Sequence, residues 1–229
     1  MLENLKKRVY EANMQLPESG LVKFTWGNVS ERDDETGYIA IKPSGVKYED
    51  LTYEDMVILD LEGNIIEGEL NPSSDTKTHI EIYKAFPEIK GIVHTHSTFA
   101  TSWAQSGRNI PSYGTTHADY MYGEIPCLRN LSQEEIDEDY EKNTGKLIVD
   151  FMKDKEVTKI PAVLLKNHGP FTWGKDAFDA VHNAVVLEEV AKMAMFTEII
   201  NNDATETPQE VQDKHYYRKH GANAYYGQK

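Results

Sequence analysis

The sequence predicts an α/β fold in which helices flank a mixed or antiparallel sheet. Segments with helical periodicity alternate loosely with short apolar runs along the chain. Several of these runs are joined by short turns, which favours antiparallel pairing over a purely parallel sheet. The chain has 229 residues, of which 39% are hydrophobic. This length and composition suit a single compact domain over residues 1–229.

Helical periodicity indicates which segments cover the sheet. The first segment repeats Leu2, Leu5, Val9, Ala12 and Leu16 at spacings of three and four, and it ends at Pro17 and Gly20. Later helices are predicted from cap residues and periodicity over 72–87, over 98–107 with Ser97 as the cap, from the Ser132–Glu135 capping box, over 144–155, over 176–200 and over 209–221.

Apolar runs bounded by turn residues predict the strands. They cover a short strand in 21–30 that runs into a loop, 37–45 ending at Pro43-Ser44-Gly45, two strands within 55–69 joined at Glu62-Gly63-Asn64, 90–97, and 161–174 with a polar end.

Charge and cysteine content exclude several classes of protein. The net charge of −14 argues against a nucleic-acid or anionic-membrane binder, because both need basic surface. The N-terminal segment lacks the apolar core of a signal peptide, and no stretch approaches the roughly 20 apolar residues of a membrane span. Cys127 is the only cysteine, so we expect no internal disulfide and a reducing, cytoplasmic setting.

Two histidines stand where an apolar run ends, in "GIVHTHS". His94 and His96 are two residues apart, so on a strand their side chains share one face and can bind one metal ion. His168 follows a second apolar run, and Asp75 begins a predicted helix. Three imidazoles and a carboxylate suit catalytic Zn²⁺ or a similar divalent ion. The alternatives are surface histidines and an ordinary N-cap for Asp75.

Three loops combine Gly or Pro with hydroxyl or amide side chains, at 26–30, 42–46 and 71–76. Ser73 and Ser74, just before a helix, form a candidate phosphate site, and Lys42 could supply positive charge. The alternative is ordinary turn chemistry. None of the loops matches a P-loop or a dinucleotide fingerprint. His79, one turn after Asp75, is expected on the helix face.

Several motifs in order resemble one known family over nearly the whole chain. They are "TWGNVS", "IKPSGV", "PSSDTKTHIEIYKAFPEIKGIVHTHS", "GTTHADYMYGEIPC", "NHGPFTWG" and "DAVHNAVVLEEVAKMA". Together they resemble the class II aldolase and adducin-head family, and within it the L-ribulose-5-phosphate 4-epimerases.

The resemblance implies an α/β/α sandwich around a largely antiparallel sheet, assembled as a homotetramer with active sites between subunits. It implies zinc or another divalent metal held by His94, His96 and His168, with Asp75 close to the metal. The related aldolases carry Glu at that place, so Asp favours an epimerase.

The resemblance also implies roles for residues in the loops and near the C-terminus. The substrate phosphate would be bound by Gly27, Asn28, Ser44, Gly45, Ser73 and Ser74. Asp119 and Tyr226 would be the catalytic acid/base pair, with Tyr226 chosen over Tyr225 by alignment to the C-terminal end. Positions near the substrate would be Lys42, Thr115, Glu141, His215 and Arg218.

The expected activity is therefore interconversion of L-ribulose 5-phosphate and D-xylulose 5-phosphate, by cleavage and re-formation of the C3–C4 bond. The alternatives are an aldolase of the same family that acts on a ketose 1-phosphate, and a non-catalytic binding module like the adducin head. A metal-dependent hydrolase is a further alternative, but the chain is short for a barrel and lacks its strand–helix repeat.

Overall fold

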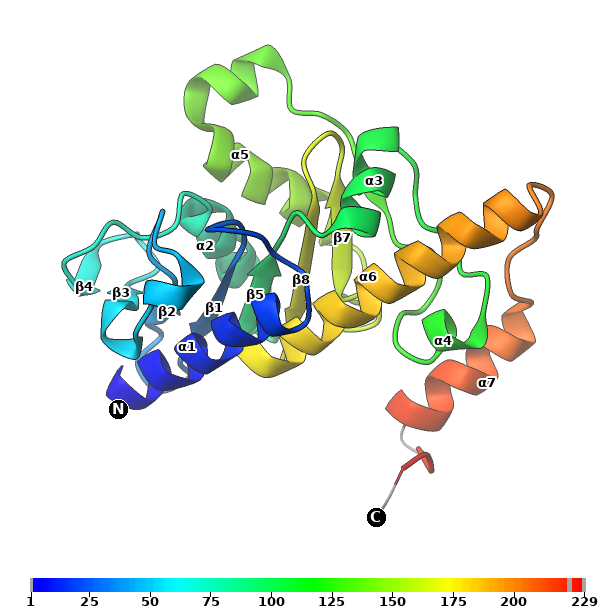
Figure 1. Cartoon of the computed structure of the whole chain (residues 1–229), viewed down its shortest axis with the longest axis horizontal. Coiled ribbons are helices and arrows are strands. Elements are labelled where there is room, and N and C mark those ends of the chain that lie inside the picture. Colours follow the sequence, from blue (N-terminus) through cyan, green and yellow to red (C-terminus); the bar gives the residue numbers. More distant parts are fainter. Residues whose placement is uncertain (1, 222–223, 228–229) are drawn as a thin grey trace.

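The computed structural model describes residues 2–221 and 224–227, and over these residues one eight-stranded sheet forms the centre of the molecule (Figure 1). The strand order is β4-β3-β2-β1-β5-β8-β7-β6, and neighbouring strands pair antiparallel except β6 with β7. The strands are β1 (Asn28–Arg32), β2 (Ile39–Ile41), β3 (Val57–Leu59), β4 (Ile65–Glu67), β5 (Gly91–His94), β6 (Cys127–Leu128), β7 (Ala162–Leu165) and β8 (Pro170–Gly174).

Helices cover both faces of this sheet, which confirms the predicted α/β/α sandwich. On one face lie α1 (Leu2–Glu18), α3 (Thr98–Ser106) and α6 (Ala177–Ile200), and on the other lie α2 (Thr76–Ala85) and α5 (Gln133–Met152). The short α4 (Thr115–Ala118) packs against α7 (Gln209–His220) at one end of the molecule, and two 3₁₀ turns cover Tyr48–Asp50 and Tyr53–Asp55 (Figure 1).

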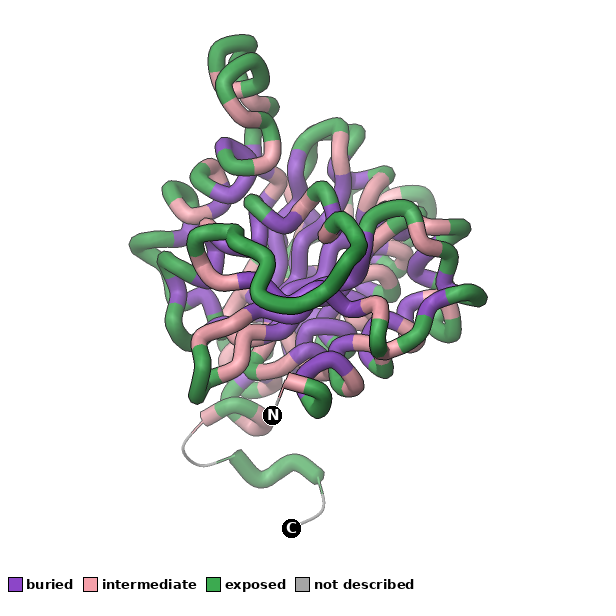
Figure 2. Tube along the Cα trace, turned by 90° about the vertical axis from the view of Figure 1, so that its left-hand side faces the viewer, coloured by how far each residue is buried: buried purple, intermediate pink, exposed green. Residues whose placement is uncertain are grey.

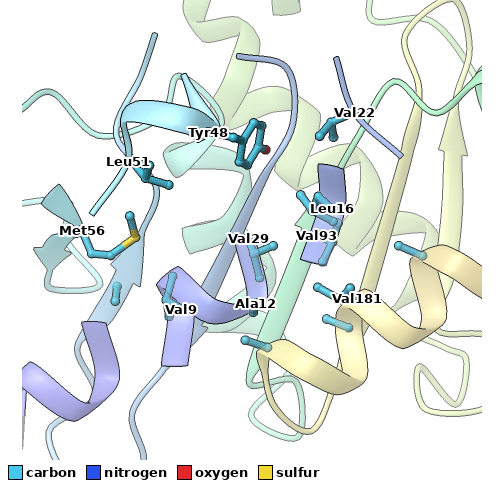
Figure 3. Packing of buried hydrophobic residues seen from close by; sticks show 14 of the residues in the cluster. Val9, Ala12, Leu16, Val22, Val29, Tyr48, Leu51, Met56, Val93 and Val181 are labelled. Carbon is cyan, nitrogen blue, oxygen red and sulfur yellow. The ribbon is translucent and has the colours of Figure 1, made fainter. Parts of the chain in front are cut away.

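Alternation along β5 divides the core into two layers. Val93 packs with Ala12 and Leu16 of α1, whereas Ile92 packs with the residues of α2 and α5, because successive side chains of a strand point to opposite faces. Figure 3 shows the first of these layers, in which Val29 of β1 packs with residues of α1. Figure 2 shows buried residues concentrated along the central strands and exposed ones on the outer turns.

The first predicted strand is displaced from its expected place. Residues 21–27 are irregular, because Phe24 and Gly27 take left-handed backbone angles, with φ of 54° and 75°. β1 therefore begins only at Asn28. Glycine is required at 27, since a Cβ there would lie 2.9 Å from the carbonyl oxygen of His94.

Two other expectations are corrected. Residues 161–174 form a hairpin of two strands, β7 and β8, because Asn167 takes a left-handed angle (φ 61°) and reverses the chain before Pro170. The helices expected at 132 and at 144–155 are one helix, α5, which is interrupted at Asp139. α4 and β6 were not predicted.

Within the described chain, no helix combines the length and the apolar character that crossing a lipid bilayer requires.

Gly91 lets the start of α6 lie directly on β5. A Cβ at this position would stand 2.0 Å from the carbonyl oxygen of Asp176, the residue before α6. We expect Gly91→Ala to lower the free energy of unfolding by about 3 kcal/mol, because backbone must move to remove the clash. Gly114→Ala is the control, since its Cβ would meet nothing within 4 Å, and it should cost at most about 1 kcal/mol. Urea unfolding of both variants measures the difference, and equal midpoints would contradict this account.

Candidate metal centre and substrate pocket

Three imidazoles converge at one end of the sheet. His94 is the last residue of β5, His96 follows two residues later, and His168 lies in the turn between β7 and β8. The β5–β8 pairing sets His94 opposite Phe171 and so brings this turn beside the end of β5. One potential ligand atom from each ring lies within 4.8 Å of the others, and Nε2 of His94 is 3.2 Å from Nε2 of His96.

Backbone and aromatic contacts orient the His94 ring. Its Nδ1 is 2.9 Å from the carbonyl oxygen of Pro170, and since a carbonyl only accepts, Nδ1 carries the proton in that bond. Nε2 of the neutral ring is then left with a lone pair for a metal. The ring also stacks on Phe171, with centroids 4.3 Å apart.

The electrostatics of the cluster favour the neutral, metal-binding form of His96 and His168. Burial, reinforced by the charges of His94 and His96, lowers the pKa of His168 to about 4. Burial and His94 also lower the pKa of His96. Nδ1 of His168 is buried without a hydrogen-bond partner among the described residues. Three imidazoles with converging nitrogen atoms fit a divalent cation, so the triad could bind one.

Asp75 lines the same pocket and does not cap its helix. It occupies the N-cap position of α2 without a side-chain capping bond, and its carboxylate accepts from Nδ2 of Asn28 at 2.7 Å. Burial acts to raise the pKa of Asp75, but the charges of His94 and His79 and the bond from Asn28 outweigh burial and leave it lowered. Among the described residues, the cluster with converging ligand atoms consists of the three imidazoles alone.

The loops expected to bind phosphate line a cavity of about 320 Å³ together with the imidazoles. Its walls are Thr25, Trp26, Gly27, Asn28, Lys42, Pro43, Ser44, Gly45, Ser73, Ser74, Asp75, His94, His96 and His168. The structure therefore brings the predicted loop residues and the predicted metal ligands to one pocket.

Hydrogen bonds between the loops shape this pocket. Nδ2 of Asn28 donates to Oγ of Ser73 at 3.0 Å, and the amide of Ser73 donates to the carbonyl of Lys42 at 3.0 Å. The hydroxyl of Tyr48 donates to the carbonyls of Trp26 and Gly27, each at 3.0 Å. These bonds join three segments that are far apart in the sequence.

Lys42 is the cation of the pocket wall. Its side chain is buried, and its ammonium donates to the carbonyl of Val46 at 2.7 Å. Burial lowers the pKa of Lys42 to about 8, so the ammonium is mostly charged at neutral pH and is lost at mildly alkaline pH.

The other predicted residues form a second cluster, on α4 and α7. The carboxylate of Asp119 accepts from Nη2 of Arg218 at 2.7 Å and from Nε at 2.9 Å, and it lies 3.0 Å from Nδ1 of His215. Thr115 begins α4, four residues before Asp119. The exposed Tyr226 has its ring 4.7 Å from the guanidinium of Arg218.

This second cluster, Thr115, Asp119, His215, Arg218 and Tyr226, lies away from the imidazoles. A cavity lined by Tyr120, Pro161, Gly174 and His220 adjoins it, and Gly174 ends β8 whereas His168 precedes the start of β8. The two groups thus sit at opposite ends of β8. Glu141 is separate from both, on α5, where its backbone carbonyl accepts from Oγ1 of Thr78 at 2.6 Å.

Positive charge surrounds Asp119. Burial acts to raise its pKa, but the hydrogen bonds from Arg218 and His215 and the charge of Lys219 outweigh burial and hold it below its usual value. Asp119 is therefore ionised at neutral pH and can accept a proton.

Sequence reasoning missed three residues of the site. Phe171 orients His94 by stacking, and Tyr48 joins two of the loops. Trp26 lies beside His96, with the two ring centroids 6.3 Å apart. Only Trp26 lay within a loop that the sequence had singled out. His79 lies on α2 as expected, on its buried face, with Nδ1 2.7 Å from Oγ of Ser30.

Comparison with known proteins agrees with this architecture. The family model described as "Class II Aldolase and Adducin N-terminal domain" matches residues 7–195. An L-fuculose 1-phosphate aldolase superposes with a TM-score of 0.79 at 25% identity, covering 94% of this chain and 95% of that one. YgbL from Klebsiella pneumoniae, a putative aldolase/epimerase/decarboxylase, gives 0.72 at 22% identity over 92% and 97%. The L-fuculose-1-phosphate aldolase from Thermus thermophilus gives 0.68 at 22% identity over 89% and 98%.

The family match covers most of the chain, the structural likeness extends over the sheet and its helices, and the histidine triad lies at the end of that sheet. The chain belongs to the class II aldolase and adducin N-terminal domain family.

Proposed function

We propose that this protein is a metal-dependent epimerase that interconverts L-ribulose 5-phosphate and D-xylulose 5-phosphate. The observation that carries the proposal is the single pocket in which three imidazoles adjoin loops of hydroxyl, amide and glycine residues. Such a pocket suits a substrate with a phosphate at one end and neighbouring carbonyl and hydroxyl oxygens at the other.

The chemistry requires cleavage of a carbon–carbon bond. C4 of a 2-ketopentose 5-phosphate is β to the carbonyl, so removing its hydrogen gains no enolate stabilisation. Removing the proton of the C4 hydroxyl instead lets the C3–C4 bond break, leaving the enediolate of dihydroxyacetone and glycolaldehyde phosphate. Re-addition to the other face of the aldehyde gives the C4 epimer.

His94, His96 and His168 would hold the metal, for which zinc suits the nitrogen donors. A bound divalent ion supplies positive charge that stabilises the enediolate oxygens. The protein contributes the orientation of the His94 ring through Pro170 and Phe171, and burial favours the neutral form of His96 and His168.

Retention of the phosphate separates an epimerase from an aldolase. Ser73, Ser74, Ser44 and Gly45 line the pocket and would hold glycolaldehyde phosphate until it is attacked again. Lys42 adds a buried positive charge to this wall. A pocket that lost this fragment would release two products.

Two groups must handle the proton of the C4 hydroxyl, one for each epimer, and we assign them to Asp119 and Tyr226. Asp119 is ionised and so suits the base for one epimer. Tyrosine is a weak base near neutral pH, and Arg218 and Lys219 place positive charge 4.7 and 4.5 Å from the Tyr226 ring. Because these groups lie at the far end of β8 from the imidazoles, we propose that a neighbouring copy supplies them in a homotetramer.

An aldolase acting on a ketose 1-phosphate is the second candidate, because an L-fuculose 1-phosphate aldolase is similar over nearly the whole chain. Asp75 favours the epimerase. Its short carboxylate is held by Asn28 at the edge of the imidazole cluster, at the place where the resemblance implies a Glu in aldolases.

The direct test is conversion of L-ribulose 5-phosphate to D-xylulose 5-phosphate in a coupled assay. We expect activity with one equivalent of divalent metal per chain by elemental analysis, loss of activity after chelation, and recovery on adding Zn²⁺. Dihydroxyacetone should not accumulate, because both fragments are retained. Stoichiometric release of dihydroxyacetone would identify an aldolase, and a metal-free active enzyme would contradict the assignment of the histidines.

Mixing two inactive variants tests whether the active site is shared between copies. His96→Ala removes a metal ligand, and Asp119→Asn removes the base, which should lower turnover by about 10²–10⁴-fold. Co-refolding the two chains in equal amounts should restore up to about a quarter of wild-type activity, because about that share of interfaces combines an intact half from each chain. No gain over the separate variants would place both groups within one chain and contradict a shared site.

Lys42 predicts how substrate affinity depends on pH. Its lowered pKa, about 8, means that the ammonium is present below this pH and is lost above it. KM for the phosphorylated substrate should therefore rise as the pH increases through about 8. Lys42→Met should raise KM at pH 7 and remove this dependence, whereas an unchanged dependence in the variant would assign it to another group.

A further inference from the structure

The ring of His96 has few hydrogen-bond partners among the described residues. His94 is oriented by the Pro170 carbonyl, but the exposed His96 ring makes its one described hydrogen-bond contact with His94 itself. Two hydrogen bonds of the flanking backbone are long, with 3.4 Å from the amide of Thr95 to the Pro170 carbonyl and 3.4 Å from the amide of Ser97 to Oγ1 of Thr95. The position of His96 therefore depends on how the chain is held just after it.

The segment that carries His96 packs closely against the turn that carries His168. At Gly169, beside His168, a Cβ would lie 2.7 Å from the carbonyl oxygen of Thr95 and 3.2 Å from Cδ2 of His96. The turn carrying His168 thus lies directly against the segment carrying His96. A small shift of either segment changes the distance between two of the three imidazoles.

A carboxylate from another helix holds the chain at this place. Glu188 of α6 accepts from the amides of Phe99 and Ala100, each at 2.9 Å. These are amides in the first turn of α3, which otherwise lacks a cap, because the side chain of Ser97 makes no capping bond. Charge-assisted bonds to free amides at a helix start are strong, and negative charge is favourable there.

Glu188 itself comes from a rigid element. Its neighbours Leu187 and Val190 are buried in the cluster that joins α6 to α3 and β7. α6 also contacts β5 and β8, the strands that lead to His94 and the His168 turn. A carboxylate on α6 can therefore fix the position of the start of α3 relative to His94 and His168.

We propose that Glu188 is a positioning residue of the metal centre, which fixes His96 by clamping the start of α3. This inference rests on the metal site of the proposed function. Residues that orient metal ligands from outside the first coordination sphere change metal affinity by about 10–100-fold when replaced. Glu188 would position His96 through backbone amides, whereas most such residues contact the ring of the ligand itself.

The test measures Co²⁺ binding to the purified chain by visible absorption and calorimetry, which needs no turnover. We expect Glu188→Ala to weaken Co²⁺ binding by about tenfold or more and to change the d–d absorption band. Glu188→Gln keeps one acceptor oxygen and should lie between this variant and the wild type. Glu189→Ala is the matched control, because Glu189 is the exposed neighbour on the same helix, and it should bind as the wild type does.

A double-variant cycle shows whether Glu188 acts through His96. In a His96→Ala background, replacing Glu188 should cause no further loss of Co²⁺ affinity, because the ligand that it positions is gone. Circular dichroism and thermal unfolding of the apo variants report folding separately. If Glu188→Ala does not fold, Glu188→Gln replaces it in the Co²⁺ measurements.

Three outcomes would overturn the inference. The first is a lower Tm for the Glu188 variants with unchanged affinity and spectrum, which would make Glu188 a structural cap only. The second is an equal loss of affinity in the presence and absence of His96. The third is a wild-type chain that binds no Co²⁺, which would overturn the metal site as well. Metal binding without epimerase activity would instead contradict the proposed function and leave the role of Glu188 standing.

Discussion

The antiparallel pairing of β5 with β8 is the constraint on which the site depends. It sets His94 opposite Phe171, so one imidazole stacks on a ring of the neighbouring strand and donates to the Pro170 carbonyl. The same pairing brings the turn with His168 beside the segment with His96. A slip of one residue would turn His94 to the opposite face of the sheet and separate the three rings, because side chains alternate along a strand.

Different parts of the chain carry the candidate metal ligands and the candidate phosphate-binding groups. A strand end, the segment after it and a tight hairpin carry the imidazoles, and burial lowers the pKa of His96 and of His168. Loops carry the groups assigned to phosphate, and they are joined by Asn28, Ser73 and Tyr48 through bonds between distant segments. Under the proposed function, proton transfer falls to a third part, around Asp119, at the opposite end of β8. Under that proposal, binding is a property of one chain and turnover is a property of the proposed homotetramer.

Much of the fold could be predicted from local patterns. The first helix, the hairpin of β3 and β4 and the long helix α6 follow directly from periodicity and turn residues, and the family motifs led to the sandwich. The strand predictions were wrong where a left-handed residue interrupts an apolar run that otherwise resembles a strand. Phe24 is apolar but left-handed, so the predicted strand starts later, and Asn167 reverses a run that looks like one strand. α4 and β6 are too short to show a period.

For the site, the sequence by itself predicted that His94 and His96 would share a side of the chain, from the two-residue period of a strand, although β5 ends at His94. It also determined that three loops offer small and hydroxylated residues. Only the tertiary structure decided that His168 joins the two imidazoles, that Asn28 holds Asp75, and that the Asp119 cluster lies at the other end of β8. It alone decided that Glu188 caps α3, 88 and 89 residues away in the chain. Distances of this kind follow from strand pairing and helix packing, which no short-range pattern encodes.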